Sequence, residues 1–331
     1  MKSFDRHMRQ QILLIQTAFI GDAILATGVL EKLHACFPGV SIDILVKRGN
    51  QSLFTNHPFI HKVMVLDKSL KRRVELGRLL REIRKERYDL ILNLHRFASS
   101  GFLTACSRAK ETRGFSKNPF SRFFSKRFPH EISATGTLHE IERNHQLIRD
   151  LTDEQPGKPR LYPSPADFHV IPTTSYHCIA PASVWATKQY PAEGWIHLMN
   201  QLPSNDQVYL LGGPHDTGLC SKLALKSRHP LVRNMAGELS LLQSAALMSG
   251  ARMNYVNDSA PLHLASAMNA PVTAVFCSTV PEFGFGPLSD RSHVADIEEV
   301  MACRPCGIHG RNACPKGHFN CGNFIVSPVS V

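Results

Sequence analysis

The sequence contains neither of the two common glycine-rich phosphate loops. No Gly-x-Gly-x-x-Gly pattern follows an apolar strand, because Gly284 and Gly286 lie in a proline-bounded stretch that stops short of it. The pattern Gly-x-x-x-x-Gly-Lys-Ser/Thr is also missing. Both absences count against a nicotinamide-dependent dehydrogenase and against a P-loop nucleotide hydrolase.

An uninterrupted hydrophobic run long enough to cross a bilayer is missing as well. Gly21 and Asp22 break the apolar stretch 12–30, and a carboxylate near the bilayer centre is costly. No small-residue cleavage site ends this stretch cleanly, as a secretion signal requires. The nine cysteines are an odd number and suit a reducing compartment better than a disulfide scaffold. The sequence therefore predicts a cytoplasmic protein.

Acidic residues are too few to balance the basic ones in the first half of the chain. Residues 1–150 hold 26 Lys or Arg against 14 Asp or Glu, whereas residues 151–331 hold 12 against 13. An acidic partner for one half explains this asymmetry, and the alternatives are nucleic acid, anionic lipid or a phosphorylated substrate. A basic surface that only aids solubility is the plainer alternative.

Short apolar runs alternate with longer amphipathic segments, a pattern typical of parallel sheets covered by helices. The predicted strands are residues 12–16, 41–46, 62–66, 90–94, 176–180, 207–211, 253–257 and 272–276. The predicted helices are residues 22–37, 70–86, 139–151, 192–201, 216–227, 239–249 and 261–268. Four prolines in residues 154–167 indicate a linker between a domain at 1–153 and another at 168–331. The expected fold class is α/β, with two Rossmann-like parallel-sheet domains facing a cleft.

Asp22 is the candidate catalytic residue of the first half. It follows a predicted strand and Gly21, and it stands where a helix begins. Aspartate is common there for helix capping alone. At the carboxyl end of a strand it also suits a general base, which would take the proton from an acceptor hydroxyl.

Two segments of the second half suit a diphosphate. After the strand 176–180 come Thr187, which offers a hydroxyl, and Lys188, which offers a charge, although a surface lysine is the plain alternative. After the strand 207–211 come Gly212 and Gly213, which let a nucleotide approach the backbone closely.

A third segment, Asp258-Ser259-Ala260-Pro261-Leu262-His263, ends a strand and starts a helix. Ser259 is a good N-cap residue, and proline suits the first helical turn. The N-terminus of such a helix offers free N–H groups to a phosphate. A lone histidine is more often structural, but His263 in this company is predicted to contact the donor.

Together these segments resemble the ADP-heptose:lipopolysaccharide heptosyltransferases of glycosyltransferase family 9, which have the GT-B fold. The resemblance is carried by residues 12–30, by the Lys188-x-x-Pro191-x-x-x-Trp195 run and by residues 258–265. It implies an inverting transfer that needs no metal ion. It also implies that Asp22 is the base. Thr187 and Lys188 would then grip the donor phosphates, and Asp258, Ser259 and His263 would surround the sugar and diphosphate.

The cysteines near the end resemble a segment of the second-heptose branch of this family. Their spacing alone suggests a structural zinc held by Cys303, Cys306, Cys314 and Cys321. Reduced cysteines packed in a loop, or a redox pair, are the alternatives.

Residues 113–130 combine five Lys or Arg residues with five phenylalanines. This composition suits a membrane interface, where Lys117, Arg122, Lys126 and Arg127 would meet lipid or acceptor phosphates. Nucleic-acid binding, or a surface loop whose phenylalanines fold inward, are the alternatives.

The leading hypothesis is thus a heptosyltransferase that uses ADP-heptose and a phosphorylated lipid A–core acceptor. It would work at the cytoplasmic face of the inner membrane and bind no nucleic acid. The rival hypotheses are a GT-B transferase with another donor, a basic nucleic-acid-binding protein with a zinc knuckle, and an inactive relative.

Overall fold

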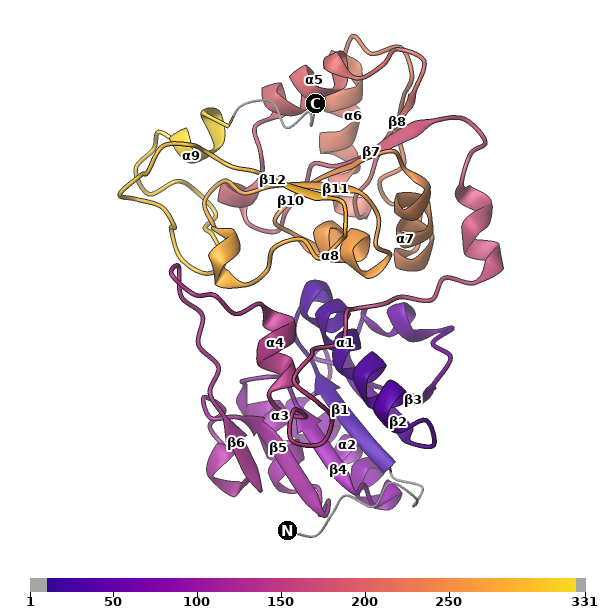
Figure 1. The fold of residues 1–331 in the computed structure, drawn as a ribbon, viewed down its shortest axis with the longest axis vertical. Coiled ribbons are helices and arrows are strands. Elements are labelled where there is room, and N and C mark those ends of the chain that lie inside the picture. Colours follow the sequence, from indigo (N-terminus) through magenta and orange to yellow (C-terminus); the bar gives the residue numbers. More distant parts are fainter. Residues whose placement is uncertain (1–10, 326–331) are drawn as a thin grey trace. The chain divides into compact units, whose positions relative to one another are not determined.

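The computed structural model describes residues 11–325 of the chain. They form two units. The first unit comprises the residues up to Glu131 together with Glu140–Tyr162, and the second comprises Ile132–His139 and the chain from Pro163 on. Each unit contains one parallel β-sheet covered by helices (Figure 1).

The first sheet has the strand order β3-β2-β1-β4-β5-β6, and all its neighbouring strands are parallel. Its strands are β1 (Gln11–Gln16), β2 (Ser41–Lys47), β3 (Ile60–Leu66), β4 (Leu90–Asn93), β5 (Glu111–Phe115) and β6 (Lys126–Phe128). The central strands β1 and β4 are buried almost throughout, as parallel strands with helices on both faces must be.

Helices cover both faces of the first sheet. They are α1 (Ile20–Cys36), α2 (Arg72–Glu86), α3 (Ala98–Ala105) and α4 (Glu140–His145), with short 3-10 turns η1 (Gln51–Phe54) and η2 (Ser121–Phe123). Leu13 and Ile15 of β1 share a buried cluster with Leu79 and Ile83 of α2. Because side chains alternate along a strand, Ile12 and Leu14 point to the other face.

The second sheet repeats this strand order, as β12-β11-β10-β7-β8-β9, and is parallel throughout. Its strands are β7 (Tyr176–Ala180), β8 (Gln207–Leu210), β9 (Val232–Asn234), β10 (Asn254–Asn257), β11 (Val272–Val275) and β12 (Ser292–Ala295). In both sheets the chain starts in the middle, builds one side and returns to build the other. This is the arrangement of a doubly wound nucleotide-binding fold.

The helices of the second unit are α5 (Ala192–Gln201), α6 (Thr217–Lys226), α7 (Leu241–Gly250), α8 (Ala260–Ala267) and α9 (Asn320–Asn323). Its 3-10 turns are η3 (Pro165–Val170), η4 (Ala186–Lys188), η5 (Pro214–Asp216) and η6 (Pro281–Phe283). Trp195 and Leu198 of α5 share a buried cluster with Ile179 of β7, and Cys321 near the end of the chain joins it.

Residues 153–162 pack along α1. The Nζ atom of Lys32 lies 2.6 Å from Asp153, and the N–H of Arg160 donates to the Thr27 hydroxyl at 2.9 Å. At Gly28 the backbone of α1 comes so close to Gly157 that a Cβ would overlap the carbonyl oxygen of Gly157. The first part of the predicted linker 154–167 therefore packs along the side of α1.

The α/β fold class is confirmed, and every predicted strand is present. The sequence analysis missed α3, β5, β6, β9 and β12, which are short, and it extended α4 by several residues. β6 and β9 have only three residues each, too few for a hydrophobic alternation to show.

Candidate functional site

The carboxyl ends of β7 and β10 lie side by side, where the strand order of the second sheet reverses. Loops that diverge at such a point leave a crevice in which open α/β sheets bind ligands. Asn257, the last residue of β10, joins the two loops. Its side-chain amide donates to the carbonyl of Pro181 at 2.8 Å and accepts from the N–H of Tyr190 at 2.9 Å. This amide fixes the loop after β7 relative to β10.

Lys188 and Asp258 meet at this edge of the sheet. Lys188 ends η4, after β7, and Asp258 directly follows β10. The Nζ atom lies 2.6 Å from Oδ2, and the two side chains are only 14% and 8% exposed. The hydroxyl of Thr279, which comes from the loop after β11, donates to the same Oδ2 at 2.7 Å. The carboxylate therefore holds the lysine charge at a defined place in the crevice.

Helix α8 begins directly after Asp258 and Ser259. The Ser259 side chain does not cap the helix, and its hydroxyl lies 3.5 Å from the carbonyl oxygen of Ala182. Pro261 has no N–H, and the N–H of Leu262 donates to the carbonyl of Ser259 at 3.0 Å. The N–H of Ala260 is therefore the group at the start of α8 that can bind an anion with the help of the helix dipole. His263 is buried in the same helix, with its ring 6.5 Å from that of Phe285. The structure thus brings together the predicted residues Lys188, Asp258, Ser259 and Ala260.

Gly212 and Gly213 follow β8, the neighbour of β7. The N–H of Gly213 donates to Oδ2 of Asp216 at 2.8 Å, and a Cβ on Gly212 would come within 2.7 Å of the Asp216 Cβ. The local turn alone therefore accounts for a glycine at 212. The predicted close approach of a nucleotide to this backbone stays a prediction.

The side chain of Thr187 is buried and points away from solvent. Its hydroxyl oxygen accepts hydrogen bonds from the Ser278 hydroxyl at 2.9 Å and from the N–H of Arg311 at 2.8 Å. Its own N–H donates to the carbonyl of Arg311 at 3.0 Å. The hydroxyl predicted to touch the diphosphate thus ties η4 to the cysteine-rich segment, residues 303–321.

Arg304 anchors the cysteine-rich segment on the sheet. Its guanidinium group lies 2.6 Å from Asp296 and donates to three carbonyl oxygens just after β11. These oxygens belong to Phe276, Cys277 and Thr279, at 3.1, 2.7 and 2.7 Å. The sequence analysis missed Arg304 and Arg311 because no local pattern marks an arginine that binds backbone carbonyl groups.

The four cysteines predicted as zinc ligands, Cys303, Cys306, Cys314 and Cys321, lie near one another: burial raises the pKa of the Cys321 thiol to about 11, and the charges of the other three contribute. Cys321 is buried in the core, and the thiol of Cys306 donates to the carbonyl of Cys303 at 3.3 Å. Within residues 11–325, no group of three or more His, Cys, Asp or Glu side chains is placed to hold a metal ion. The structural zinc site stays a prediction.

In the first unit, Asp22 lies in the first turn of α1. Its Oδ2 accepts the N–H of Phe19 at 3.2 Å. Burial, together with the negative charge of Glu140, raises the pKa of Asp22 to about 7, and the backbone hydrogen bonds and Arg96 oppose this only in part. A carboxyl group with a pKa near neutrality is well suited to general base catalysis at physiological pH.

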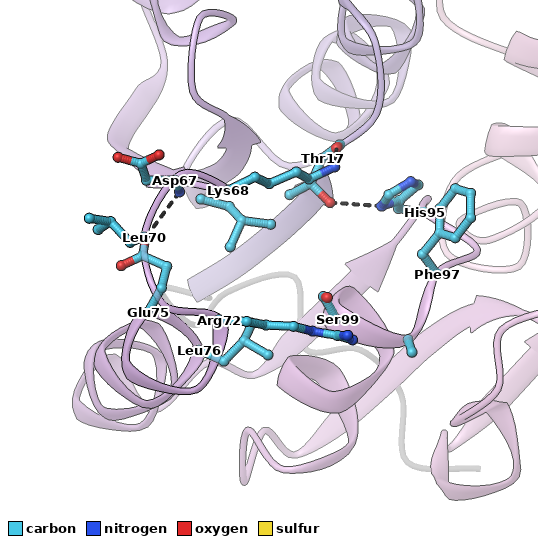
Figure 2. Close-up of a pocket in the computed structure, with 12 residues that line it drawn as sticks. Thr17, Asp67, Lys68, Leu70, Arg72, Glu75, Leu76, His95, Phe97 and Ser99 are labelled. Atoms are coloured by element: carbon cyan, nitrogen blue, oxygen red, sulfur yellow. Dashed lines mark hydrogen bonds between the residues drawn. The ribbon is translucent and has the colours of Figure 1, made fainter.

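A pocket of about 460 Å³ opens beside β1, at the carboxyl ends of β1, β3 and β4 (Figure 2). Thr17 follows β1, Asp67 and Lys68 follow β3, and His95 follows β4. The Thr17 hydroxyl lies 2.7 Å from Nδ1 of His95. Burial lowers the pKa of His95 to about 4, so its ring is neutral at physiological pH.

The carboxylates that line this pocket have cationic partners outside it. Asp67 lies 3.0 Å from Arg48, and Glu75 lies 2.8 Å from Arg78. The charges directed into the pocket are therefore the cations.

Those cations are Lys68 and Arg72. The ammonium group of Lys68 lies 3.4 Å from the carbonyl oxygen of Thr17, and the guanidinium group of Arg72 extends toward Ser99 (Figure 2). Partial burial and the neighbouring Lys47 lower the pKa of Lys68. An anion in the pocket would relieve that repulsion.

The basic segment 113–130 is part of the first sheet: it contains the end of β5, the turn η2 and β6. Arg113 is buried and pairs with Glu111 at 2.7 Å and with Asp150. Lys126 lies 2.6 Å from Asp150, so this predicted membrane contact already has an acidic partner. The segment is therefore not a free loop.

All four predicted membrane contacts, Lys117, Arg122, Lys126 and Arg127, are exposed. The guanidinium group of Arg122 stacks 4.7 Å from the ring centre of Phe123, which is also exposed. Phe115 and Phe124 are buried, so the phenylalanines divide between core and surface. In the part of the chain that the structure describes, no helix has the length and apolarity to cross a membrane.

Residues 76–307 match glycosyltransferase family 9 (heptosyltransferase), which is more than half of the chain. The chain belongs to glycosyltransferase family 9. The parallel sheets and the strand-end residues described above are therefore those of a glycosyltransferase.

This chain is similar to individual members of family 9 over most of its own length and most of theirs. The chain is 25% identical to lipopolysaccharide heptosyltransferase 1 of Pseudomonas aeruginosa, over 89% of this chain and 86% of the relative. It is 24% identical to lipopolysaccharide heptosyltransferase 2 of Salmonella typhimurium, over 86% and 87%. These near-equal identities do not support the predicted placement in the second-heptose branch.

The fold is that of solved heptosyltransferases. The E. coli heptosyltransferase WaaC with ADP superimposes with a TM-score of 0.73 at 20% identity, over 86% of this chain and 93% of that one. The predicted GT-B fold is confirmed by this likeness.

Thr187 offers a direct test of how the cysteine-rich segment supports this glycosyltransferase. Thr187→Val should lower the stability of the protein by about 1–3 kcal/mol, because the buried hydroxyl of Ser278 and the N–H of Arg311 lose their acceptor. Thr187→Ser keeps the oxygen and should stay close to the parent protein. Chemical denaturation measures both variants, and a Val variant as stable as the Ser variant would show that these hydrogen bonds contribute nothing.

Proposed function

We propose that this chain transfers heptose from ADP-heptose to the inner core of lipopolysaccharide, in an inverting reaction that needs no metal ion. The observation that carries the proposal is the position of Lys188 beside the N-terminus of α8, at the switch point of the second sheet. Family membership and relatives named for heptose transfer support it.

The second unit is proposed to bind the donor and to stabilise its leaving group. As the bond between the anomeric carbon and the diphosphate oxygen breaks, negative charge grows on ADP. The ammonium group of Lys188 and the N–H of Ala260, at the start of α8, would meet that charge. Asp258 would keep the ammonium group in place, since Lys188 is fixed by it at 2.6 Å.

The first unit is proposed to activate the acceptor. Asp22 would take the proton of an acceptor hydroxyl while the hydroxyl oxygen forms its bond to the anomeric carbon. Attack on the face opposite the leaving diphosphate inverts the configuration of that carbon. The raised pKa of Asp22 makes it a stronger proton acceptor than an ordinary aspartate.

Calorimetric titration with ADP separates the proposed roles of Lys188 and Asp22. ADP should bind without added metal. Lys188→Ala should weaken ADP binding by roughly tenfold or more, because it removes one charge-assisted contact. Lys222→Ala, which removes an exposed lysine of α6, is the matched control. Asp22→Asn should keep ADP affinity and lose turnover by a factor of about 100 or more.

Several results would contradict these roles. Failure to bind ADP would remove the donor assignment, and a preference for UDP or GDP would change the proposed nucleotide while leaving the fold intact. Full turnover in Asp22→Asn would remove Asp22 as the base.

The pocket of Figure 2 is proposed to hold an anionic group of the acceptor. Its carboxylates are paired and its histidine is neutral, which leaves Lys68 and Arg72 as the charges that face a ligand. Phosphate and carboxylate groups of a phosphorylated lipid A–core both have the matching charge.

Lys68→Met and Arg72→Gln should each raise the acceptor KM by roughly tenfold, because each removes one charge-assisted contact. ADP affinity should not change. Arg73→Gln is the control, since Arg73 is exposed on the same helix and does not line the pocket. Initial rates at varied acceptor concentration measure the effect, and equal KM values for the three variants would refute the assignment.

Exposed basic residues near Phe123 are proposed to hold the enzyme at the cytoplasmic face of the inner membrane. Lys117, Arg122 and Arg127 carry exposed charge, and Arg122 stacks on the exposed ring of Phe123. Cations next to an aromatic ring suit the headgroup region of an anionic bilayer.

Changing Lys117, Arg122 and Arg127 together to Gln should weaken binding to phosphatidylglycerol vesicles by on the order of a hundredfold, at about 1 kcal/mol per charge. The control changes Lys222, Lys226 and Arg228 to Gln and removes the same charge from exposed positions of the second unit. Vesicle sedimentation measures binding. Equal loss in both triple variants would show that net charge alone is responsible.

A further inference from the structure

One aromatic side chain lines the pocket of Figure 2 and has no part in the proton transfer or in the stabilisation of the leaving group. Phe97 follows β4 and lines the same pocket as Lys68 and Arg72, yet it is 66% exposed. A single exposed hydrophobic residue on a protein surface is ordinary. The position and the surroundings of Phe97 therefore decide whether its ring serves a ligand.

Phe97 occupies the N-cap position of α3, where a phenylalanine contributes nothing to the helix. Its backbone is extended, as at other N-caps, and its side chain makes no capping hydrogen bond. Serine, threonine, aspartate and asparagine are preferred there, because their oxygen atoms accept an N–H of the first helical turn. Since most of Phe97 is exposed, burial of its ring does not make up for the missing cap.

The backbone of Phe97 is held by three hydrogen bonds. Its carbonyl oxygen accepts from the Ser100 hydroxyl at 2.9 Å, from the side-chain amide of Asn118 at 3.1 Å and from the N–H of Gly101 at 3.1 Å. Asn118 is only 2% exposed, and a Cβ on Gly101 would overlap its side-chain oxygen. Glycine at 101 therefore lets a buried amide fix the residue that carries the exposed ring.

The ring of Phe97 is oriented by His95. The two ring centres lie 4.7 Å apart, and the ring planes meet at 62° (Figure 2). His95 is fixed in turn, since its Nδ1 lies 2.7 Å from the Thr17 hydroxyl. Because the rings meet at an angle and do not lie flat on each other, much of the Phe97 ring stays uncovered. A ring that is already oriented loses little conformational freedom when a ligand packs on it.

We propose that the ring of Phe97 stacks on the apolar face of a sugar ring of the acceptor, while Lys68 and Arg72 bind an anionic substituent of that sugar. This rests on the proposed use of the pocket for the acceptor. A pyranose exposes C–H groups with slight positive charge on one face, and the face of an aromatic ring is negative, so the two attract as water leaves both. The pocket volume of about 460 Å³ is within the range of small-molecule sites.

Phe97 thereby adds a selection that the two cations cannot make. Lys68 and Arg72 attract any anion, including free phosphate. The aromatic face favours an anion that is attached to a sugar ring, because free phosphate has no C–H groups to stack. Phe97 is thus assigned as a specificity residue for the acceptor, and the cations supply most of the attraction.

Three substitutions at Phe97 test the aromatic contact, with a deacylated, phosphorylated lipid A–core saccharide as the acceptor so that membrane binding does not contribute. Phe97→Ser and Phe97→Leu should each raise the acceptor KM by roughly fivefold to tenfold, because both remove the aromatic face, while kcat changes by less than about twofold. Phe97→Trp keeps an aromatic face and should restore the parent KM. Calorimetry should show unchanged ADP affinity in all three variants. Phe324→Leu, at a 56% exposed phenylalanine of the second unit, is the matched control.

Chemical denaturation separates this role from a structural one. Phe97→Ser places a preferred N-cap residue at the start of α3, so the variant should unfold at the same or a higher denaturant concentration than the parent. It should nevertheless bind the acceptor less well. A phenylalanine that served the packing of the protein would show the opposite, a loss of stability on truncation.

The possible results distinguish this proposal from the proposed function. A parent-like acceptor KM in Phe97→Ser or in Phe97→Leu would overturn the stacking contact and leave heptose transfer intact. Lower stability of Phe97→Ser would make Phe97 a structural residue and would also overturn it. If the parent protein does not transfer heptose to the saccharide, the acceptor assignment fails, and the role of Phe97 fails with it.

Discussion

The alignment of parallel strands is the constraint on which the rest of this structure depends. In a parallel sheet all carboxyl ends lie at one edge, and a chain that starts in the middle must diverge there. Both sheets of this protein follow the same order, so each has one such point, at β1 and β4 and at β7 and β10. Thr17 and His95 meet at the first, and Lys188 and Asp258 meet at the second. The functional groups are thus where the topology places them, although no glycine-rich phosphate loop is present.

A buried ion pair such as Lys188–Asp258 is not in itself strong evidence of stabilisation, because both groups lose their hydration. Its partners suggest a different benefit. Thr279 donates to the carboxylate, and Asn257 and Thr187 fix the loops on either side. The surrounding hydrogen bonds therefore hold a charge in place before any ligand arrives, and preorganised charge of this kind stabilises a leaving group without reorganisation.

Sequence patterns predicted the elements that are buried on both faces, such as β1, β7 and β10, because a continuous apolar run bounded by turns is a local signal. They also predicted Lys188 and Asp258, since Asp258 directly follows such a strand and Lys188 lies in the loop after another. They did not predict the partners. Arg304 donates to backbone carbonyl groups far away in sequence, and the backbone N–H of Arg311 donates to the distant Thr187 hydroxyl. Arg113 is buried because Glu111 and Asp150 neutralise it. Such contacts depend on how segments distant in sequence pack, and no spacing of residue types encodes them.

The two units place their carboxylates in opposite settings. Asp258 lies 2.6 Å from the ammonium group of Lys188, and this ion pair suits a structural role. Burial and the negative charge of Glu140 raise the pKa of Asp22 to about 7, so its proton can be gained and lost near neutral pH. Proton transfer requires a carboxyl group with such a pKa, whereas stabilising a leaving diphosphate requires a cation held in place, as Lys188 is. The proposed division of labour between acceptor activation and donor binding therefore follows from the surroundings of each carboxylate.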